Sequence, residues 1–375
     1  MDFSFDDAQE EVRALAGRIL GDEVTVDLLR EVEASQDRFS PSVWARLAQA
    51  GLLGIALPED AGGGGLGIIE QCLVLEQVGR TLAPVPVLAS IVMGAATIAA
   101  AGSPEQRRRW VAPAADGSVI LTAALAEPAS FDPLSPTTVA EPDGPGGGWR
   151  LTGVKTAVPA GPLADAVLVP ATVDGQVGVF VVPRDAPGAT LTRQRTTNGE
   201  TAGYLELDRC HVGPDGLLGS LDDGAAILRA LVERTAVGVC AMQLGVCEAA
   251  LAMTADYTKS RVQFGRPIAT FQAVGHRCAD CYIDVEAVRL TLWQAAWAVS
   301  EGLPASTEVE VARFWAADAG HRVAHAAVHL HGGMGVATEY PLHRYFVWAK
   351  QLELMLGGAT AQLLRIGAAL AAEPV

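Results

Sequence analysis

The chain has 375 residues, more than one hydrophobic core usually serves, so its length predicts two or three domains. Half of the residues are hydrophobic, 40 are glycine and 19% are charged, which excludes disordered, collagen-like and coiled-coil proteins. The formal charge is −16, and the sequence lacks the basic footprint that a nucleic-acid-binding protein needs. The six scattered cysteines, the acidic N-terminus and the lack of an uninterrupted apolar run of about 18 residues predict a soluble, cytoplasmic protein without a membrane span.

The first part of the chain has the pattern of a helical domain over residues 1–118. Asp6 starts a capping-box sequence, and Ser40 precedes a proline at the first position of a predicted helix. The glycine-rich stretch 58–67 separates these helices from another apolar helix.

Residues 119–217 have the pattern of a β domain. Short runs rich in β-branched residues, such as 165–173 and 177–183, are separated by clusters of Gly, Pro and Asp. Strands at this spacing, without helices between them, predict a small barrel or sandwich instead of alternating βαβ units.

Residues 218–375 predict a four-helix bundle. Amphipathic patterns run over 225–261, 271–301 and 307–330, and a further one follows Pro341. The predicted fold class is therefore α+β multi-domain, with an N-terminal all-α domain, a middle β-barrel or sandwich and a C-terminal four-helix bundle.

Three local motifs favour structural explanations over chemical ones. A G-x-G-x-x-G pattern within 62–67 lies between helices, whereas a dinucleotide-binding loop needs a preceding strand. The histidines at 321, 325 and 329 share one helical face but lack the further ligands of a metal site, so we expect no metal. Cys278 and Cys281 fall in the middle of a predicted helix, not at the helix N-terminus that activates a redox thiol.

Long-range motifs are more informative. SRVQFGRPIATFQAVGHRCAD (260–280) resembles the R-x-x-F-G-x-x-I-x-x-F-Q signature of the acyl-CoA dehydrogenase family, and HLHGGMGVATEYPLHRYFVWAK (329–350) resembles its glycine-bearing segment before the last helix. LAQAGLLGIALPEDAGGGGLG (47–67) is similar to part of the family's first helical domain. The resemblance covers nearly the whole chain and implies an acyl-CoA dehydrogenase-like fold, in agreement with the helix–strand–helix order predicted from periodicity.

The resemblance implies an acyl-CoA thioester as substrate and FAD as cofactor, shared across a subunit interface. In the family, the bundle of one subunit grips the adenosine and pyrophosphate end of the flavin cofactor that its neighbour holds. An arginine offers a fixed fork of donors to a pyrophosphate, and glycine backbone permits close approach. The residues that the resemblance implies in cofactor binding are Arg261, Gln263, Phe264, Gln272, His329, Gly332, Gly333, Thr360 and Gln362.

The catalytic base of the family is missing from its usual position. The family carries a glutamate just before a G-T-x-Q sequence, and here Gly358 occupies that position while Thr360 and Gln362 are kept. Some relatives carry the base on the first bundle helix, at a position that falls on Thr235 here, and Glu233 lies two residues away. Two residues turn a helix by about 200°, so Glu233 would need a bulge in the helix to reach that face.

The positions that face the flavin ring in the family have also changed. Its E-P-x-x-G-S-D loop reads EPASFDP from Glu127 here, so a bulky Phe131 and the donor-less Pro133 replace a glycine-rich loop. Its K-x-W/F-I-T/S-N-G segment reads KTAVPAG from Lys155, without the aromatic wall, the hydroxyl and the amide. Losses at the chain's own ring and base positions, with the neighbour-gripping positions kept, resemble the non-catalytic subunit of actinobacterial heteromeric acyl-CoA dehydrogenases, several of which act on steroid side-chain thioesters.

We therefore expect one half of an α2β2 heterotetramer, which completes the flavin site of a homologous catalytic subunit without a base of its own. Two alternatives stay open. One is a self-sufficient acyl-CoA dehydrogenase that uses Glu233 as its base. The other is a non-enzymatic scaffold of the same fold that binds acyl-CoA or a protein.

Overall fold

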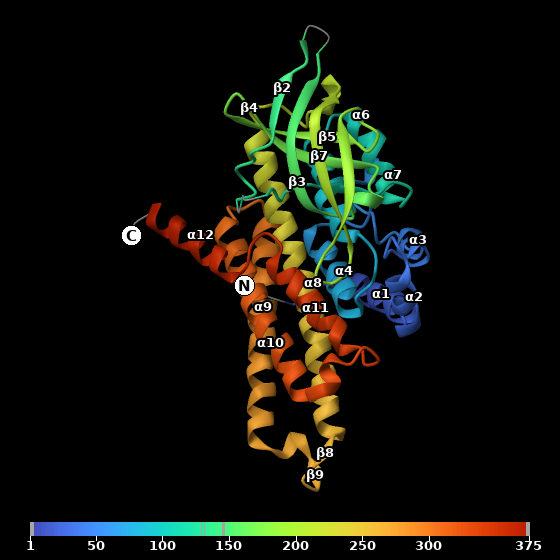
Figure 1. Cartoon of the computed structure of the whole chain (residues 1–375), viewed down its shortest axis with the longest axis vertical. Coiled ribbons are helices and arrows are strands. Elements are labelled where there is room, and N and C mark those ends of the chain that lie inside the picture. Colours follow the sequence, from blue (N-terminus) through green and yellow to red (C-terminus); the bar gives the residue numbers. More distant parts are fainter. Residues whose placement is uncertain (1–3, 129, 131, 145–146, 373–375) are drawn as a thin grey trace. The chain divides into compact units, whose positions relative to one another are not determined.

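The computed structural model describes residues 4–128, 130, 132–144 and 147–372 (Figure 1). The chain folds into two compact units whose segments alternate along the sequence. The bundle unit comprises the chain up to Leu28, Cys72–Ala83 and the chain from Ala236 onward, and the sheet unit comprises Leu29–Gln71 and Pro84–Thr235. The domain boundaries expected from the sequence, at 118 and 217, stay a prediction.

Helices form the first part of the chain, as the sequence predicts. They are α1 (Asp7–Glu23), α2 (Val26–Ala34), α3 (Pro41–Gln49), α4 (Ile68–Thr81), α5 (Ala96–Ala101), α6 (Pro104–Gln106) and α7 (Ala112–Ala115), with π-helical turns at Leu88–Ala95 and Arg107–Val111. Asp6 caps α1 within a complete capping box, and the Ser40 hydroxyl accepts from the Val43 amide at the start of α3. Both predicted caps are confirmed.

A curled seven-stranded sheet organises the middle of the chain. Its strands are β1 (Leu121–Ala123), β2 (Val139–Pro142), β3 (Trp149–Pro159), β4 (Ala166–Val173), β5 (Gln176–Pro183), β6 (Ala189–Arg195) and β7 (Thr201–Val212). The order is β1-β4-β2-β3-β7-β6, with β5 paired to β4, and β1 and β2 both run parallel to β4. Apolar side chains such as Leu151, Val169 and Phe180 pack into one core.

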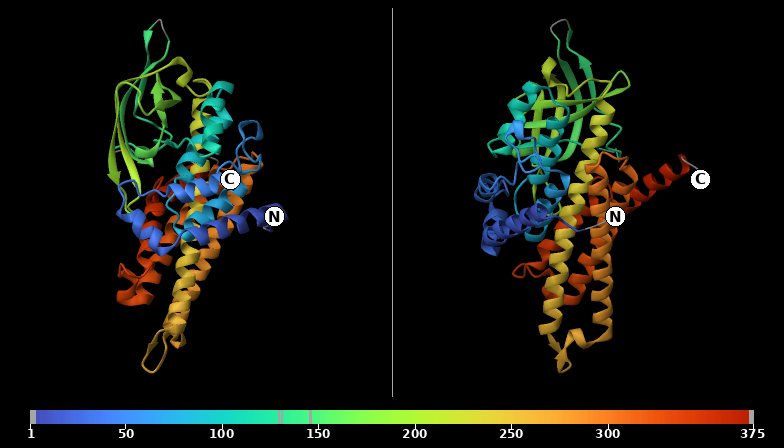
Figure 2. Two further views of the ribbon diagram at one scale, coloured as in Figure 1. Left: turned by 90° about the vertical axis from the view of Figure 1, so that its right-hand side faces the viewer. Right: turned by 180° about the vertical axis from the view of Figure 1, so that it is seen from behind.

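Long helices form the bundle unit. They are α8 (Gly224–Ser260), of which the part from Ala236 belongs to this unit, α9 (Gln272–Ser300), α10 (Ser306–His331), α11 (Leu342–Leu354) and α12 (Ala359–Ala372). A hairpin of β8 (Val262–Gln263) and β9 (Arg266–Pro267) joins α8 to α9. Both views of Figure 2 show α8 and α9 running side by side as far as this hairpin.

The expected fold class is confirmed with one correction at the C-terminal end. The amphipathic pattern after Pro341 forms two helices, α11 and α12, instead of one. The break falls where Leu356 and Gly357 adopt positive φ angles of 59° and 92°, a conformation that no right-handed helix contains.

Two helical stretches have the length and hydropathy of a membrane span, which the sequence analysis did not expect. The first is α8, in which 78% of the apolar window is buried, as in the core helix of a bundle. The second is α11 together with α12, in which 6% of the window is buried. The exposed apolar side chains of this stretch are Leu354, at the end of α11, and Leu363, Leu364 and Leu370 on α12, so the bundle unit presents an apolar surface mainly on α12.

Helix α4 crosses α8 with glycine on both sides of the contact. A Cβ atom on Gly79 would lie 2.0 Å from the Met242 carbonyl oxygen, and one on Gly245 would lie 1.9 Å from the Glu76 carbonyl oxygen. Both distances are far below van der Waals contact, so only glycine allows the two helix backbones to approach this closely.

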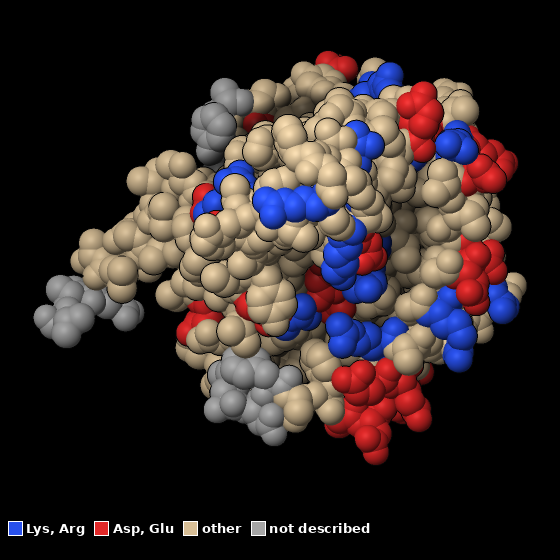
Figure 3. Space-filling view, turned by 90° about the horizontal axis from the view of Figure 1, so that it is seen from below, with Lys and Arg blue, Asp and Glu red and all other residues tan. Residues whose placement is uncertain are grey.

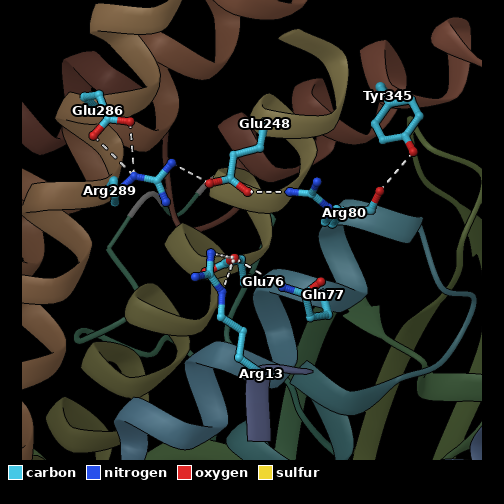
Figure 4. Close-up of polar contacts among 8 residues, drawn as sticks. All are labelled: Arg13, Glu76, Gln77, Arg80, Glu248, Glu286, Arg289 and Tyr345. Carbon is cyan, nitrogen blue, oxygen red and sulfur yellow. Dashed lines mark hydrogen bonds and ion pairs between the residues drawn. The ribbon is translucent and has the colours of Figure 1, made fainter. Parts of the chain in front are cut away.

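Arginines and glutamates surround this crossing (Figure 4). Arg13 Nη2 lies 2.8 Å from Glu76 Oε1, and Glu248 pairs with Arg80 at 2.9 Å and with Arg289 at 2.5 Å. The Glu76 side chain is fully buried, and burial and the Glu248 carboxylate raise its pKa although Arg13 acts in the opposite direction. Because buried charges are tolerated only with partners, these pairs attach α1 to α4, and α4 and α9 to α8.

We expect Gly79→Ala and Gly245→Ala each to lower the free energy of unfolding by about 1–3 kcal/mol or more, because the added methyl group overlaps a helix backbone. Urea unfolding measures the change. Gly21→Ala in α1 is the matched control, since a Cβ there meets no described atom within 4 Å. The control should gain up to about 1 kcal/mol from helix propensity, and equal effects in all three variants would contradict the close crossing.

Candidate functional site

The hairpin between α8 and α9 presents the residues of the long-range signature at the end of the bundle. Phe264 and Gly265 both have positive φ angles, 52° and 76°, as in the tight two-residue turns of β-hairpins. Phe264 is 93% exposed and meets Phe271 edge to face, with the ring centroids 6.0 Å apart. Arg261 and Gln263 are exposed as well, so the hairpin side chains predicted to grip a cofactor reach the surface.

The first residues of α9 continue this surface. Gln272 is exposed directly after the hairpin, and the Arg266 guanidinium lies 4.2 Å from the centroid of the Phe271 ring. Lys259, Arg261 and Arg277 are exposed near the same end, and Figure 3 shows basic side chains on the face seen from there. An acidic chain therefore carries several exposed cations around the hairpin, of which Lys259 pairs with Asp256 at 3.5 Å.

The glycine-bearing segment starts after His331, which contacts the last turns of α8, just before the hairpin. His329 is exposed near the end of α10, and the turn Gly332–Val336 follows it. A Cβ on Gly332 or Gly333 would meet no atom of the described chain within 4 Å, so the surface over them is open. Tyr257, in the last turns of α8, stacks on His331 with ring centroids 4.3 Å apart, which brings the two segments together.

Thr360 and Gln362 lie elsewhere, in the first turn of α12. Gln362 is buried, and its Nε2 donates to the carbonyl oxygens of Leu356 and Gly357, each at 3.1 Å, so its amide supports the preceding loop. Arg313, which contacts the same loop, lies about 24 Å from His329 along α10, at about 1.5 Å per residue. The structure thus brings together the hairpin and glycine segments but not the α12 pair.

The loop 355–358, which holds the expected position of the base, is supported from inside by Arg313. This side chain is 1% exposed, and burial lowers its pKa. Its Nη2 lies within hydrogen-bond distance of the carbonyl oxygens of Leu352 (3.3 Å), Glu353 (3.4 Å), Met355 (2.5 Å) and Gly357 (3.1 Å). The sequence analysis missed Arg313, although a lone cation on an apolar helix face is a signal for such a role.

Glycine at 358 is not required by packing. A Cβ there would lie 3.9 Å from the Glu353 carbonyl oxygen, in ordinary van der Waals contact, and the Gly358 backbone is outside the left-handed region. The backbone at 358 therefore has room for a Cβ atom, so contacts at that atom do not demand glycine.

The two segments predicted to face a flavin ring are joined by a buried ion pair in the sheet unit. Lys155 Nζ lies 2.6 Å from Glu127 Oε1 and also donates to the Pro170 carbonyl oxygen at 2.8 Å. The carboxylate accepts further hydrogen bonds from the amides and hydroxyls of Thr137 and Thr138. Burial acts to raise the pKa of Glu127, but these donors outweigh it and lower that pKa to about 2, while burial lowers the pKa of Lys155.

The remaining positions in these segments offer little chemistry. Ala157 and Ala160 both have positive φ angles, 48° and 51°, which are strained for alanine. The Ala157 amide donates to Gln194 Oε1 at 2.8 Å, which supports this irregular part of β3. Phe131 lies outside the described residues.

Helix α8 does not present Glu233 on the face of Thr235. Thr235 is fully buried and donates its hydroxyl to the Leu231 carbonyl oxygen at 2.7 Å, whereas Glu233 is half-buried. The helix is regular from Gly224 to Ser260, and this described stretch lacks the bulge that would bring Glu233 into register.

The histidine and cysteine motifs have structural contacts. His321 and His325 contact each other on α10, with ring centroids 4.2 Å apart and planes tilted by 33°. No group of three or more metal-ligating side chains is found among the described residues. Cys278 and Cys281 are free thiols within α9, and burial raises the pKa of Cys281 to about 11. A thiol with a raised pKa is a poor nucleophile near neutral pH.

Comparison with known proteins assigns the family. Profiles described as acyl-CoA dehydrogenase N-terminal, middle and C-terminal domains match residues 6–118, 122–210 and 222–371. The chain belongs to the acyl-CoA dehydrogenase family. Its homologues in this family are FAD-binding flavoproteins, and membership supports an FAD-dependent oxidoreductase.

Individual relatives cover the whole length of this family member. It is 44% identical to acyl-CoA dehydrogenase FadE27 of Mycobacterium tuberculosis over 383 residues, which span 100% of both chains. Its structure is similar to a chain of the ChsE4-ChsE5 complex from Mycobacterium tuberculosis, with a TM-score of 0.95, 45% identity and 100% of both chains covered. It is also similar to the Tcur3481-Tcur3483 steroid ACAD, with a TM-score of 0.92, 44% identity and coverage of 97% and 98%.

We expect Lys155→Met to lower the free energy of unfolding by about 3–5 kcal/mol, because it leaves the Glu127 carboxylate buried without its cation. Urea unfolding at neutral pH measures this loss. The double variant Glu127→Gln/Lys155→Met removes both charges and should recover part of the stability, whereas equal losses in the single and double variants would contradict the role of the pair.

We also expect the stabilisation by Glu127 to depend on acid. Its pKa falls from 4.5 to about 2 on folding, so the stabilisation is complete above about pH 4.5 and is lost as the pH falls towards 2. Acid unfolding of Glu127→Gln should lack this component. An unchanged acid dependence in that variant would show that another group causes it.

Proposed function

We propose that this chain is the subunit of a heteromeric acyl-CoA dehydrogenase that completes the flavin site of a homologous partner and supplies no base of its own. The observation that carries the proposal is Gly358, a position with room for a Cβ atom and no carboxylate. In the same chain the hairpin residues Arg261 and Gln263 remain exposed beside the glycine segment.

The exposed residues fit the anionic end of FAD better than its ring. Arg261 offers a guanidinium fork, Gln263 an amide and His329 an imidazole, next to open backbone at Gly332 and Gly333, and a pyrophosphate matches this set of donors. At the ring positions, Lys155 and Glu127 are bonded to each other and buried. The chain's own residues thus bind and orient the nucleotide end, and we assign the ring end to the partner.

The proposed reaction is α,β-dehydrogenation of an acyl-CoA thioester. A bound FAD supplies the acceptor for the hydride that leaves the β-carbon. Because residue 358 is glycine, removal of the α-proton requires a carboxylate of the partner. The relative named a steroid ACAD supports a steroid side-chain thioester as the substrate we propose.

Exposed apolar surface on the bundle unit supports a partner subunit in an α2β2 assembly. Along α9 the exposed side chains are Tyr282, Ile283, Leu290 and Trp297, and along α12 they are Leu363, Leu364 and Leu370. Helix α12 stands away from the rest of the bundle unit in Figure 1. Apolar surface of this kind is typical of protein interfaces, and the similar ChsE4-ChsE5 structure is a complex.

The test compares the chain purified alone with the chain co-expressed with a homologous acyl-CoA dehydrogenase chain that has the glutamate. We expect a flavin-poor chain alone, and a co-purified complex with bound FAD that is bleached by an acyl-CoA thioester. Stoichiometric flavin and bleaching in the chain alone would overturn the proposal. Absence of flavin in every pairing would favour the non-enzymatic scaffold.

We expect Arg261→Gln to weaken FAD binding to the complex about tenfold to hundredfold, because a hydrogen bond to a charged group contributes about 1.5–3 kcal/mol. Equilibrium titration with FAD, followed by flavin fluorescence, measures the affinity. Arg277→Gln is the control, since it removes the same charge from an exposed side chain near the same end of the bundle. Equal weakening in both variants would mean that net charge, not the position of Arg261, determines affinity.

We expect Glu233→Gln to leave turnover by the complex nearly unchanged, because the regular helix keeps this carboxylate off the face of Thr235. Steady-state assays with an acyl-CoA thioester and an electron acceptor measure the rate. A general base contributes about 10²–10⁴-fold, so a loss of that size would favour the self-sufficient enzyme.

A further inference from the structure

Two surface segments of the bundle unit are connected by three buried or half-buried rings. His331 is the last residue of α10 and is 3% exposed. Tyr257 of α8 stacks on its imidazole, with centroids 4.3 Å apart and planes at 23°. Tyr340 lies before α11, and its ring centroid is 5.2 Å from that of His331 and 6.4 Å from that of Tyr257, so each ring contacts the other two.

Hydrogen bonds determine the state of the imidazole. Its Nδ1 lies 2.8 Å from the Ala327 carbonyl oxygen, which can only accept, so Nδ1 carries a proton. Burial lowers the pKa of His331 and favours the neutral ring. The unprotonated Nε2 then accepts from the Tyr340 hydroxyl at 3.2 Å.

These contacts close the base of the glycine-bearing loop. His331 and Tyr340 stand at its two ends, and the exposed Gly332 and Gly333 lie between them. The His331–Tyr340 hydrogen bond therefore holds both ends of the loop together, and the Tyr257 hydroxyl donates to the His331 carbonyl oxygen at 3.4 Å.

Tyr257 extends the connection to the hairpin. Its carbonyl oxygen accepts from the Arg261 amide at 2.8 Å, so the backbone that holds His331 also starts the hairpin. We propose that Tyr257, His331 and Tyr340 form a clamp that sets the spacing between residues 261–264 and 329–333, with His331 as its central positioning residue. The link to a cofactor rests on the proposed function, whereas the coupling of the two segments does not.

Hydrogen–deuterium exchange of the free chain tests the coupling without any cofactor. We expect His331→Leu to speed exchange about three- to tenfold in both 261–266 and 332–336, because it removes both imidazole hydrogen bonds and the stack. His331→Gln should restore most of the protection, since its amide can donate to Ala327 and accept from Tyr340. Faster exchange in 332–336 with no change in 261–266 would overturn the coupling.

Tyr340→Phe and Tyr345→Phe form a matched pair for the cofactor arm of the test. Both remove one hydroxyl hydrogen bond and keep the ring, but the Tyr345 hydroxyl donates to the Arg80 carbonyl oxygen at 2.9 Å, away from the loop. In the co-expressed complex we expect Tyr340→Phe to weaken FAD binding about three- to tenfold beyond Tyr345→Phe, at similar melting temperatures. Equal FAD affinities in the two variants would overturn the positioning role.

The two arms distinguish failure of the clamp from failure of the proposed function. If the wild-type complex binds no FAD, the proposed function fails, and the positioning of a cofactor is overturned with it. The exchange experiment still decides whether the three rings couple the segments.

Discussion

The close crossing of α4 over α8 is the constraint on which the bundle unit depends. Gly79 and Gly245 leave no side chain between the two backbones, so a shift of either helix would open a gap or cause a clash. Glu76 and Glu248 can stay largely buried beside the crossing because Arg13 and the other arginines reach them there (Figure 4). The crossing thus fixes the course of α8, and with it the place where α8 presents Tyr257 and the hairpin.

The backbone conformation of the loop 355–358 does not depend on the side chain that carries the base in the family. Burying the Arg313 guanidinium is unfavourable unless its donors find acceptors, and carbonyl oxygens of the loop turn toward its Nη2 atom. Gln362 holds the same loop from the α12 side. None of these contacts involves a side chain at position 358, so the loop keeps its conformation with glycine there. What the contacts fix is the start of α12, and therefore the direction of its exposed leucines.

The sequence predicted features that depend on local physics and missed those that depend on distant partners. Capping residues such as Asp6 act within one helical turn, and the family motifs were enough to locate the hairpin and Gly358. The break after α11 was not predicted, because the positive φ of Leu356 is supported by Arg313, some forty residues away. His331 gave no signal either, since its partners are a carbonyl oxygen on its own helix and rings from two other segments. The family pattern implies cofactor binding for Gln362, which stays a prediction, and the structure shows in addition that its amide bonds to the loop.

The hairpin and glycine segments lie at the His329 end of α10, and the loop 355–358 lies near Arg313, towards its other end. Under the proposed function, this separation explains why a chain without a base remains necessary. The hairpin segment carries exposed cations. At physiological ionic strength, charges more than about 8 Å apart are largely screened. The attraction of Arg261 for a nearby pyrophosphate therefore exceeds the repulsion from the chain's net charge of −16. At the described ring positions, by contrast, Ala157 and Ala160 carry only methyl groups, and the Lys155–Glu127 ion pair satisfies itself. A dinucleotide held at its nucleotide end by this chain must therefore find its ring site on another one. The absence of a carboxylate at position 358 follows the same division, because a catalytic base is useful only beside the flavin ring.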